Sequence, residues 1–214
     1  DKSTFGFADS DSIHASDLRS TMHHSFFKIN GTDREFSIPM IGRHNVANAM
    51  AAILVGRHFG ESDEEIAAGL ANFVPTANRM EWEKGDCGED IMSDIYNSNP
   101  TAVKAVTASF GQVPVSEGGR RIAVLADMLE LGSRSADLHK GLAACLDPDK
   151  INVLYLYGPE MNHLYQALLD KYGQQNLHYY PEDEMSHLID DLKHDFVILH
   201  QMVILFVYPI NHYT

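Results

Sequence analysis

The segment Asp94-Ile95-Tyr96-Asn97-Ser98-Asn99-Pro100-Thr101 stands at the junction between an expected strand and an expected helix. Residues 90–93, just before it, have the short pattern of a half-buried strand. Asn99 can cap a helix, and Pro100 suits the first helical position because proline has no N–H to lose. Apolar residues then recur at helical spacing, namely Val103, Val106 and Phe110.

A polar loop between a strand and a helix is a frequent ligand site in open α/β sheets. The helix start would offer free N–H donors and a positive dipole, which suit a phosphate or a carboxylate. The same asparagines can also serve only as turn and cap residues. The segment is therefore a candidate binding junction, and its spacing alone leaves both interpretations open.

The chain after Arg79 alternates between strand and helix patterns. We expect strands at residues 91–94, 122–127, 153–157, 177–180 and 196–199, and helices at residues 100–110, 135–145, 160–172 and 183–193. This alternation predicts an α/β fold with a Rossmann-like, mostly parallel sheet and helices on both faces. Two strands end in an acid, Asp94 and Asp127, so two carboxylates would lie at one edge of the sheet. Each acid could instead cap a nearby helix.

The first 75 residues have a different organisation. Residues 22–29 and 34–38 flank Asn30-Gly31, which is a hairpin turn signal. A helix is expected over residues 42–59, with Val46, Met50, Ile53 and Leu54 facing inward. Ser62 and Glu65 then form the capping box of a second helix, which would carry Ile66, Leu70 and Phe73. Two helices and a few strands cannot close a normal domain, so we interpret this part as the tail of a larger one, joined through a linker at residues 75–78.

Composition restricts the class of partner. The 214 residues carry 16 Lys and Arg against 30 Asp and Glu, a net charge of -14, which disfavours nucleic acid as a partner. The sequence has no apolar run long enough to span a membrane. Two cysteines without paired spacing predict no disulfide framework and favour a reducing, cytoplasmic setting. The 12 histidines are scattered, so we expect no metal site.

Four ordered motifs together resemble the Mur ligase family. Residues 42–49, Gly-Arg-His-Asn-Val-Ala-Asn-Ala, are similar to the family's G-x-H-N-x-x-N-x motif. Asn78-Arg79 resembles the arginine that opens the family's C-terminal domain. Residues 94–100 resemble the D-x-Y-N-x-N-P segment of the branch that adds D-Ala-D-Ala. Residues 126–132, followed by His139, resemble that branch's D-M-x-E-L-G segment. The first two motifs also occur in other Mur ligases and in folylpolyglutamate synthases.

The resemblance implies both a domain plan and a reaction. Residues 1–77 would be the end of the central ATP-binding domain, and residues 78–214 the C-terminal domain, with an atypical tail after residue 199. The full-length protein would be a monomeric, cytoplasmic ligase that uses ATP and Mg²⁺. It would join D-Ala-D-Ala to UDP-N-acetylmuramoyl-tripeptide through an acyl phosphate, in peptidoglycan precursor synthesis. Two alternatives remain open: another Mur-type or folylpolyglutamate-type amide ligase, and a non-enzymatic ligand-binding module.

The resemblance also implies roles for individual residues. The nucleotide would be bound by His44, Asn45, Asn48, Arg79, Asp94 and Tyr96. Asn48 would face the adenine with His44 on the same helical face, Arg79 would reach the phosphates, and Asp94 would bind the ribose. The D-Ala-D-Ala pocket would be lined by Tyr96, Asn97, Asn99, Thr101, Asp127, Glu130 and His139. The last three would shape the second loop of that pocket. His44 and Asn45 could instead cap their helix, Arg79 could be a surface linker residue, and Tyr96 could pack on the sheet edge.

The sequence departs from the family in two places. The phosphate-binding loop of the G-T-x-G-K-T kind, the magnesium-binding acid and the modified lysine do not occur in it. We therefore expect this polypeptide alone to have no ligase activity. After Leu199 the sequence no longer resembles the family, and we interpret the change as a shift of reading frame near residue 200. In that case Val203–Tyr208 would be an exposed apolar strand that promotes aggregation.

Overall fold

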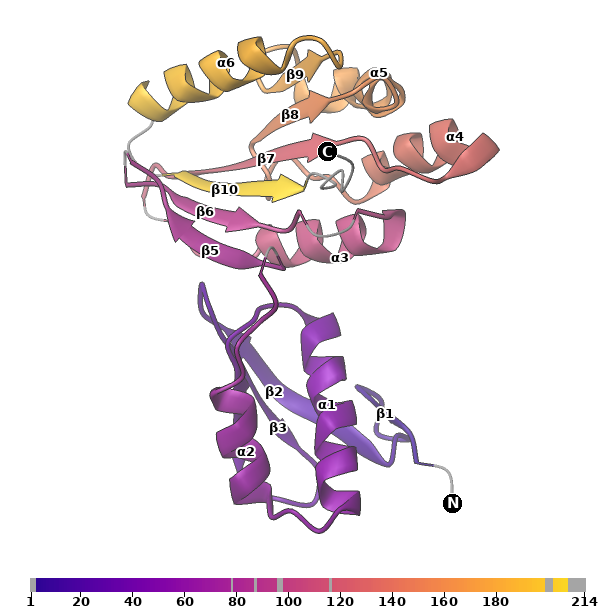
Figure 1. Ribbon diagram of the computed structural model, residues 1–214, viewed down its shortest axis with the longest axis vertical. Coiled ribbons are helices and arrows are strands. Elements are labelled where there is room, and N and C mark those ends of the chain that lie inside the picture. The colour runs from indigo at the N-terminus through magenta and orange to yellow at the C-terminus, as the bar shows by residue number, and fades with distance from the viewer. Residues whose placement is uncertain are drawn as a thin grey trace. The chain divides into compact units, whose positions relative to one another are not determined.

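The computed structural model describes residues 3–77, 79–86, 88–95, 98–115, 117–198 and 202–207, with side chains described up to residue 194. The chain divides into two compact units, Asp1–Thr76 and Ala77–Thr214. Figure 1 labels most of the helices and strands of each unit.

The N-terminal unit is built on a four-stranded sheet in the order β1-β2-β3-β4. Its strands are Phe5–Gly6 (β1), Ile13–Ser20 (β2), Ser25–Ile29 (β3) and Glu35–Ile38 (β4). β1 runs parallel to β2, while β2–β3 and β3–β4 are antiparallel pairs. The predicted hairpin is therefore confirmed as β3–β4, and Gly31 supplies the left-handed residue of its turn, with φ at +81°.

Helices α1 (Arg43–His58) and α2 (Asp63–Ala71) contribute to one core with this sheet. Val46, Met50 and Ile53 of α1 are fully buried as predicted, whereas Leu54 is only partly buried. The predicted placement of Phe73 on the second helix is wrong. α2 ends at Ala71, and the Phe73 side chain is 48% exposed.

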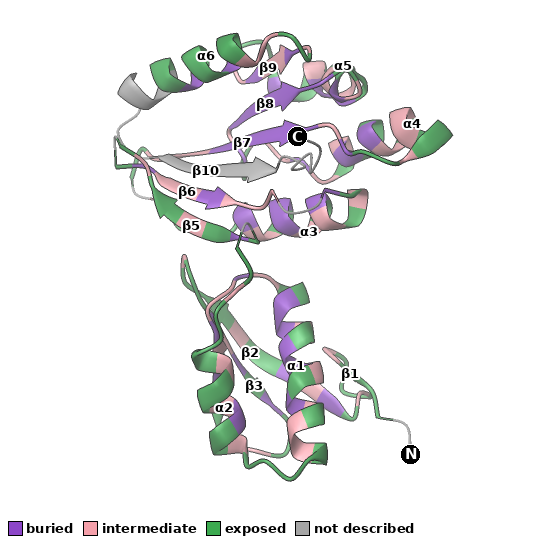
Figure 2. Ribbon diagram, in the orientation of Figure 1, coloured by how far each residue is buried: buried purple, intermediate pink, exposed green. Residues whose placement is uncertain are grey.

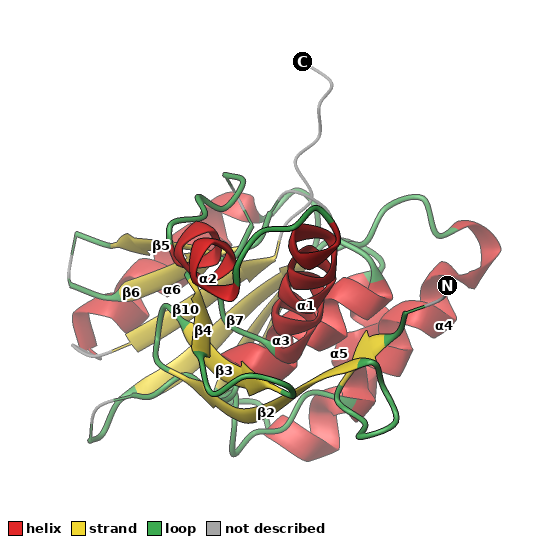
Figure 3. Cartoon of the chain, turned by 90° about the horizontal axis from the view of Figure 1, so that it is seen from below, coloured by secondary structure: helices red, strands yellow, loops and turns green. Residues whose placement is uncertain are grey.

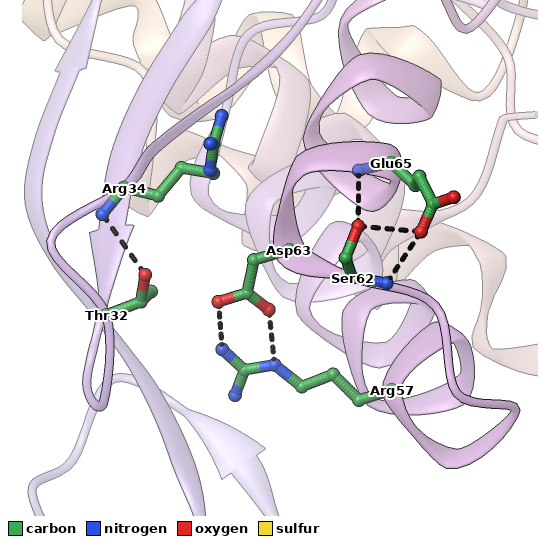
Figure 4. Close-up of polar contacts among 6 residues, drawn as sticks. All are labelled: Thr32, Arg34, Arg57, Ser62, Asp63 and Glu65. Carbon is green, nitrogen blue, oxygen red and sulfur yellow. Dashed lines mark hydrogen bonds and ion pairs between the residues drawn. The ribbon is translucent and has the colours of Figure 1, made fainter.

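The start of α2 is held by polar contacts that sequence spacing predicts well (Figure 4). The Glu65 N–H donates to Ser62 Oγ at 3.3 Å, and the Ser62 N–H donates to Glu65 Oε2 at 2.9 Å, which completes the capping box. Arg57 forms two hydrogen bonds of 2.8 Å to the Asp63 carboxylate. These contacts join the end of α1 to the start of α2.

The C-terminal unit is built on a six-stranded sheet in the order β5-β6-β10-β7-β8-β9 (Figure 1). The strands are Glu81–Lys84 (β5), Asp90–Ser93 (β6), Arg120–Ala126 (β7), Val153–Tyr157 (β8), Leu177–Tyr180 (β9) and Met202–Val207 (β10). β5 is antiparallel to β6, and all the other pairs are parallel. The mostly parallel sheet is therefore confirmed.

Helices cover both faces of this sheet. The α-helices are Pro100–Phe110 (α3), Ser135–Lys140 (α4), Met161–Tyr172 (α5) and Met185–Ile198 (α6), and short 3-10 turns lie at Gly132–Arg134 (η1) and Gly141–Ala144 (η2) (Figure 3). Alternate residues of β7 and β8, such as Val124 and Tyr155, pack with Leu188 and Leu192 of α6. The intervening residues of these strands point to the opposite face, and α5 also contacts β8 and β9. β7 and β8 are mostly buried as a result (Figure 2).

The last strand differs from the prediction. The expected strand at residues 196–199 is wrong, because α6 continues to Ile198. The strand is instead Met202–Val207, and it pairs in parallel with both β6 and β7. Its six residues are all apolar, which is the composition typical of central strands in parallel sheets. The backbone of residues 203–207 is therefore paired on both sides, while the expected exposure of the strand Val203–Tyr208 stays a prediction, and Tyr208 lies outside the described residues.

Candidate functional site

Asn99, at the junction between β6 and α3, forms a complete N-terminal cap for α3. Asn99 Oδ1 accepts the N–H of Thr101 at 3.1 Å and that of Ala102 at 3.0 Å. The Val103 N–H donates to the Asn99 carbonyl at 2.9 Å, and Pro100 has no N–H. The expectation of free N–H donors at this helix start is therefore wrong, because internal acceptors already satisfy them. A ligand here would meet side chains and not the helix end.

Asp94 and Arg79 lie close together at the end of β6. Strand pairing brings this about, because Glu81 of β5 lies opposite Ser93 of β6. Asp94 Oδ1 accepts the Met80 N–H at 3.3 Å. Burial raises the pKa of Asp94, and the Met80 hydrogen bond and the positive charge of Arg79 offset part of this increase. The pair thus offers a hydroxyl-binding carboxylate beside an exposed guanidinium.

Other residues of the same segment have different positions. Tyr96 and Asn97, predicted for the nucleotide and dipeptide sites, lie outside the described residues, as does Asn78. Thr101 is exposed in the first turn of α3. Ser98 is buried, and its hydroxyl has no hydrogen-bond partner within the described part of the chain.

Asp127 caps a helix from the end of the neighbouring βα unit. Its carboxylate accepts the Met161 N–H at 2.8 Å and the Glu160 N–H at 3.1 Å, at the start of α5. Burial raises the pKa of Asp127, and these two backbone hydrogen bonds work against that increase. Asp127 therefore acts as a structural cap, which was the alternative interpretation. Each of its carboxylate oxygens already accepts a backbone hydrogen bond.

His139 of α4 lies beneath the loop that follows β7. The side chain is fully buried. Its Nε2 accepts the Met128 N–H at 2.9 Å, and its Nδ1 lies 2.8 Å from the Ser135 carbonyl oxygen. Glu130, in the same loop, is exposed and has a φ of +62°. Of the three residues predicted for this loop, Glu130 is exposed, Asp127 is half-buried and His139 is fully buried.

The N-terminal unit contributes the residues of the G-x-H-N motif on α1. His44 and Asn48 are both exposed and stand one helical turn apart, hence on one face. Asn45 is 7% exposed, and its Nδ2 donates to the Ile41 carbonyl at 2.8 Å. Gly42 caps the helix with a φ of +101° and no side-chain bond. Asn45 thus holds the turn that leads into α1, while His44 and Asn48 remain accessible.

The strand order of the C-terminal sheet determines how far apart Asp94 and Asp127 lie. Asp94 and Asp127 follow parallel strands and lie at the same edge of the sheet, as predicted. The sequence did not indicate that β10 lies between β6 and β7, which separates these two strands by about 10 Å. Met80 and Gly158 were missed as well, because both act through backbone contacts. A Pro after Gly158 is the only local signal for the second.

No group of three or more His, Cys, Asp or Glu in the described ranges could hold a metal ion. No helix in the part of the chain that the structure describes is both long and apolar enough to cross a membrane.

Two family profiles match the chain. "Mur ligase middle domain" matches residues 1–56, and "Mur ligase, glutamate ligase domain" matches residues 78–201. A UDP-N-acetylmuramoyl-tripeptide–D-alanyl-D-alanine ligase of Bacillus subtilis (strain 168) is 35% identical over 180 residues, which are 84% of this chain and 39% of that protein. A UDP-N-acetylmuramate–L-alanine ligase of Gloeobacter violaceus is 43% identical over 75 residues, 35% of this chain and 16% of that protein.

Solved structures share the fold. A MurF from Acinetobacter baumannii has a TM-score of 0.76 at 23% identity, covering 96% of this chain and 43% of that one. A MurF ligase from Thermotoga maritima in complex with ADP has a TM-score of 0.73 at 21% identity, covering 96% of this chain and 44% of that one. The chain thus spans about two fifths of the length of these relatives, 39% in the B. subtilis case.

Proposed function

The chain belongs to the Mur ligase family, and we propose that it is the C-terminal part of the ATP-dependent ligase that adds D-Ala-D-Ala to UDP-N-acetylmuramoyl-tripeptide. The observation that carries this proposal is the proximity of the Arg79 charge to Asp94 at the carboxyl edge of the sheet, directly before the Tyr96-Asn97-Ser98-Asn99 segment. The 35% identity to the B. subtilis D-Ala-D-Ala-adding ligase supports the choice of substrate.

The proposed reaction has two steps. The terminal carboxylate of the tripeptide attacks the γ-phosphorus of ATP, which forms an acyl phosphate and releases ADP. The amine of D-Ala-D-Ala then attacks the acyl carbon, an amide forms, and inorganic phosphate and a proton leave. Negative charge accumulates on the phosphoryl group in both steps, so the protein must neutralise it and align three substrates.

The residues of this chain would mainly bind and align these substrates. Asp94 would accept hydrogen bonds from the ribose hydroxyls, and its neighbour Arg79 would interact with the phosphates. Asn48 and His44, exposed on one face of α1, would contact the adenine. The T. maritima structure of the same fold holds ADP, which agrees with a nucleotide site. Tyr96 would contribute to both the nucleotide site and the dipeptide site.

The dipeptide site would be formed by Tyr96, Asn97, Asn99 and Thr101, with Glu130 from the loop after β7. Asn99 Oδ1 already accepts the two hydrogen bonds of the helix cap, so only the amide nitrogen of Asn99 would donate to the dipeptide. Asp127 and His139 are occupied by backbone groups and would act through the loop.

ATP-dependent ligases of this kind also use Mg²⁺, which would shield the phosphates. The described residues do not fit such a site, because no cluster of three acidic or other metal-binding side chains occurs among them. We therefore assign no Mg²⁺-binding role to the described residues of this chain. We further propose that the full-length protein is a cytoplasmic monomer whose partners are these small molecules, and not nucleic acid or membrane.

A second candidate is ligation of L-alanine to UDP-N-acetylmuramate, which the Gloeobacter violaceus relative favours through its 43% identity over 75 residues. The test is phosphate release by the full-length protein with ATP and matched pairs of acceptor and amine. We expect release with the UDP-tripeptide and D-Ala-D-Ala together, and background release when either is omitted. Release with UDP-N-acetylmuramate and L-alanine alone would establish the second candidate and overturn the first.

A further inference from the structure

The imidazole of His139 makes hydrogen bonds on both sides of the loop that follows β7. Its Nε2 lies 2.9 Å from the backbone nitrogen of Met128, and its Nδ1 lies 2.8 Å from the Ser135 carbonyl oxygen. Ser135 Oγ also approaches Nδ1 at 3.3 Å. The ring is fully buried, so these contacts are shielded from water. One side chain thus connects the two ends of the segment from residue 128 to residue 135.

The partners of His139 determine where its proton resides. A backbone N–H can only donate, so Nε2 must accept from Met128. A carbonyl oxygen can only accept, so Nδ1 must carry the hydrogen and donate to Ser135. The ring is therefore a neutral imidazole with its proton on Nδ1. A proton added at Nε2 would face the Met128 N–H and break that contact.

The loop is anchored independently at its first residue. The Asp127 N–H donates to the Tyr157 carbonyl at 3.1 Å, and the Asp127 carboxylate accepts the Glu160 and Met161 N–H groups. Met128 is 2% exposed and therefore also part of the core. These contacts fix the base of the loop on β8 and α5.

The tip of the loop, by contrast, is presented to solvent in an unusual conformation. Glu130 has a φ of +62° and Gly132 one of +57°. A left-handed conformation at a non-glycine residue persists only where the surroundings impose it, and such residues occur frequently at functional sites. Leu129, next to it, is 48% exposed. The base of the loop is therefore fixed by hydrogen bonds, and its exposed tip carries the carboxylate of Glu130.

We propose that His139 is a positioning residue whose Nδ1–H tautomer holds the loop 127–135 so that Glu130 is presented to the amine end of the dipeptide substrate. The choice of the dipeptide as ligand rests on the proposed function, but the tautomer and the loop geometry do not. An exposed carboxylate complements the positive charge of a dipeptide amine. Asp94, the ribose-binding candidate, follows a different strand, so the ATP site lies outside the control of His139.

The first test is ¹⁵N NMR of the histidine rings in this chain, with His139 assigned by comparison with His139→Gln. We expect a protonated Nδ1 and an unprotonated Nε2 at neutral pH. A ring protonated at Nε2, or at both nitrogens, would overturn the proposal. This result needs no ligand and no activity, so it is decided even if the substrate assignment fails.

The second test is the kinetics of the full-length protein. His139→Phe removes both hydrogen bonds, and we expect the KM for D-Ala-D-Ala to rise about tenfold while the KM for ATP stays within about twofold. His139→Gln places an acceptor near the Met128 N–H and should restore the dipeptide KM to within about threefold of the wild type. His163→Gln, an exposed histidine of α5, is the matched control and should change neither constant.

The outcomes of the second test separate positioning from a general loss of structure. A His139→Gln protein no better than His139→Phe, or an ATP KM that rises as much as the dipeptide KM, would contradict the proposal. If His139→Phe does not fold, the NMR result decides the tautomer, and a dipeptide KM of His139→Gln more than about threefold above that of the wild type contradicts the proposal. Turnover that never depends on the dipeptide would refute the proposed function and leave the tautomer result intact.

Discussion

Replacement of Gly158 by alanine tests the contact between Asp127 and α5. Gly158 has a φ of +108°, which an L-residue rarely adopts. A Cβ built on Gly158 would lie 2.5 Å from Asp127 Cγ and 2.6 and 2.7 Å from the two carboxylate oxygens. The carboxylate would have to move away, and it would then lose the N–H groups of Glu160 and Met161.

The expected cost follows from these two effects. The left-handed backbone at an alanine costs about 1–2 kcal/mol. Displacing an acidic cap from the start of α5 costs about 1–3 kcal/mol, since the hydrogen bonds involve a charged acceptor. We therefore expect Gly158→Ala to lower the unfolding free energy of the C-terminal unit by about 3–4 kcal/mol, and its Tm by about 10 °C.

The assay is urea unfolding followed by tryptophan fluorescence, because Trp82 is the only tryptophan and lies on β5 of the same unit. Two glycines of this unit serve as controls. Gly173 has a φ of +71° with no atom within 4 Å of its added Cβ, so Gly173→Ala measures the backbone effect alone. Gly141 has open space and an ordinary φ of -65°, so Gly141→Ala should be close to neutral.

A double-mutant cycle identifies the steric part. In an Asp127→Ala background the three contacting atoms are absent, so Gly158→Ala should cost only the backbone effect. We expect a coupling of about 2 kcal/mol between the two positions. Equal costs for Gly158→Ala and Gly173→Ala, or additivity with Asp127→Ala, would refute the claim that Gly158 makes room for the Asp127 cap.

Three further predictions concern other groups. Burial raises the pKa of Asp94 in the folded state above its unfolded value of about 3.9. The contribution of this group to stability is therefore fully present below the unfolded pKa and is lost as the pH rises through the folded pKa. In urea titrations, the unfolding free energy of Asp94→Asn should thus increase relative to that of the wild type as the pH rises from about 4, and a pH-independent difference would contradict this. Ser62→Ala should destabilise the N-terminal unit by about 1 kcal/mol and Ser62→Gly by a few tenths, measured by circular dichroism; equal effects would exclude the cap. Asn99→Asp should keep the cap of α3 and stay within about 0.5 kcal/mol of wild type, yet raise the dipeptide KM; an unchanged KM would leave Asn99 a cap only.

Local signals predicted the fold wherever one element determines its own limits. Asn99 and Pro100 gave the start of α3, and the Ser62 capping box gave the start of α2, because both depend on neighbours within four residues. The strands β8 and β9 were predicted to the residue, since each is a short run rich in apolar and aromatic residues between turn residues. Periodicity is informative at this range.

The prediction failed where distant parts of the chain decide. β5 has the polar sequence Glu-Trp-Glu-Lys and becomes a strand only by pairing with β6. Residues 196–198 suit a strand or a helix, and the longer apolar run of β10 takes the place between β6 and β7.

The candidate site shows the same limit. The motifs identified Asp94, Asp127 and His139 as important, but not what they contact. Asp127 caps a helix that starts more than 30 residues later in the chain, and His139 binds backbone groups that no motif records. A ligand-binding residue and a residue that holds a loop leave the same trace in sequence, so only the structure separates their roles.

The most direct measurement of the central claim is an isotope experiment on the full-length protein. The UDP-tripeptide, labelled with ¹⁸O in its terminal carboxylate, is incubated with ATP and D-Ala-D-Ala, and mass spectra of the nucleotide product and of the released phosphate are recorded. The proposed reaction predicts two results. The UDP-linked tripeptide is extended by the dipeptide, and the released phosphate carries ¹⁸O from the carboxylate. An unextended nucleotide, or unlabelled phosphate beside an extended product, would contradict it.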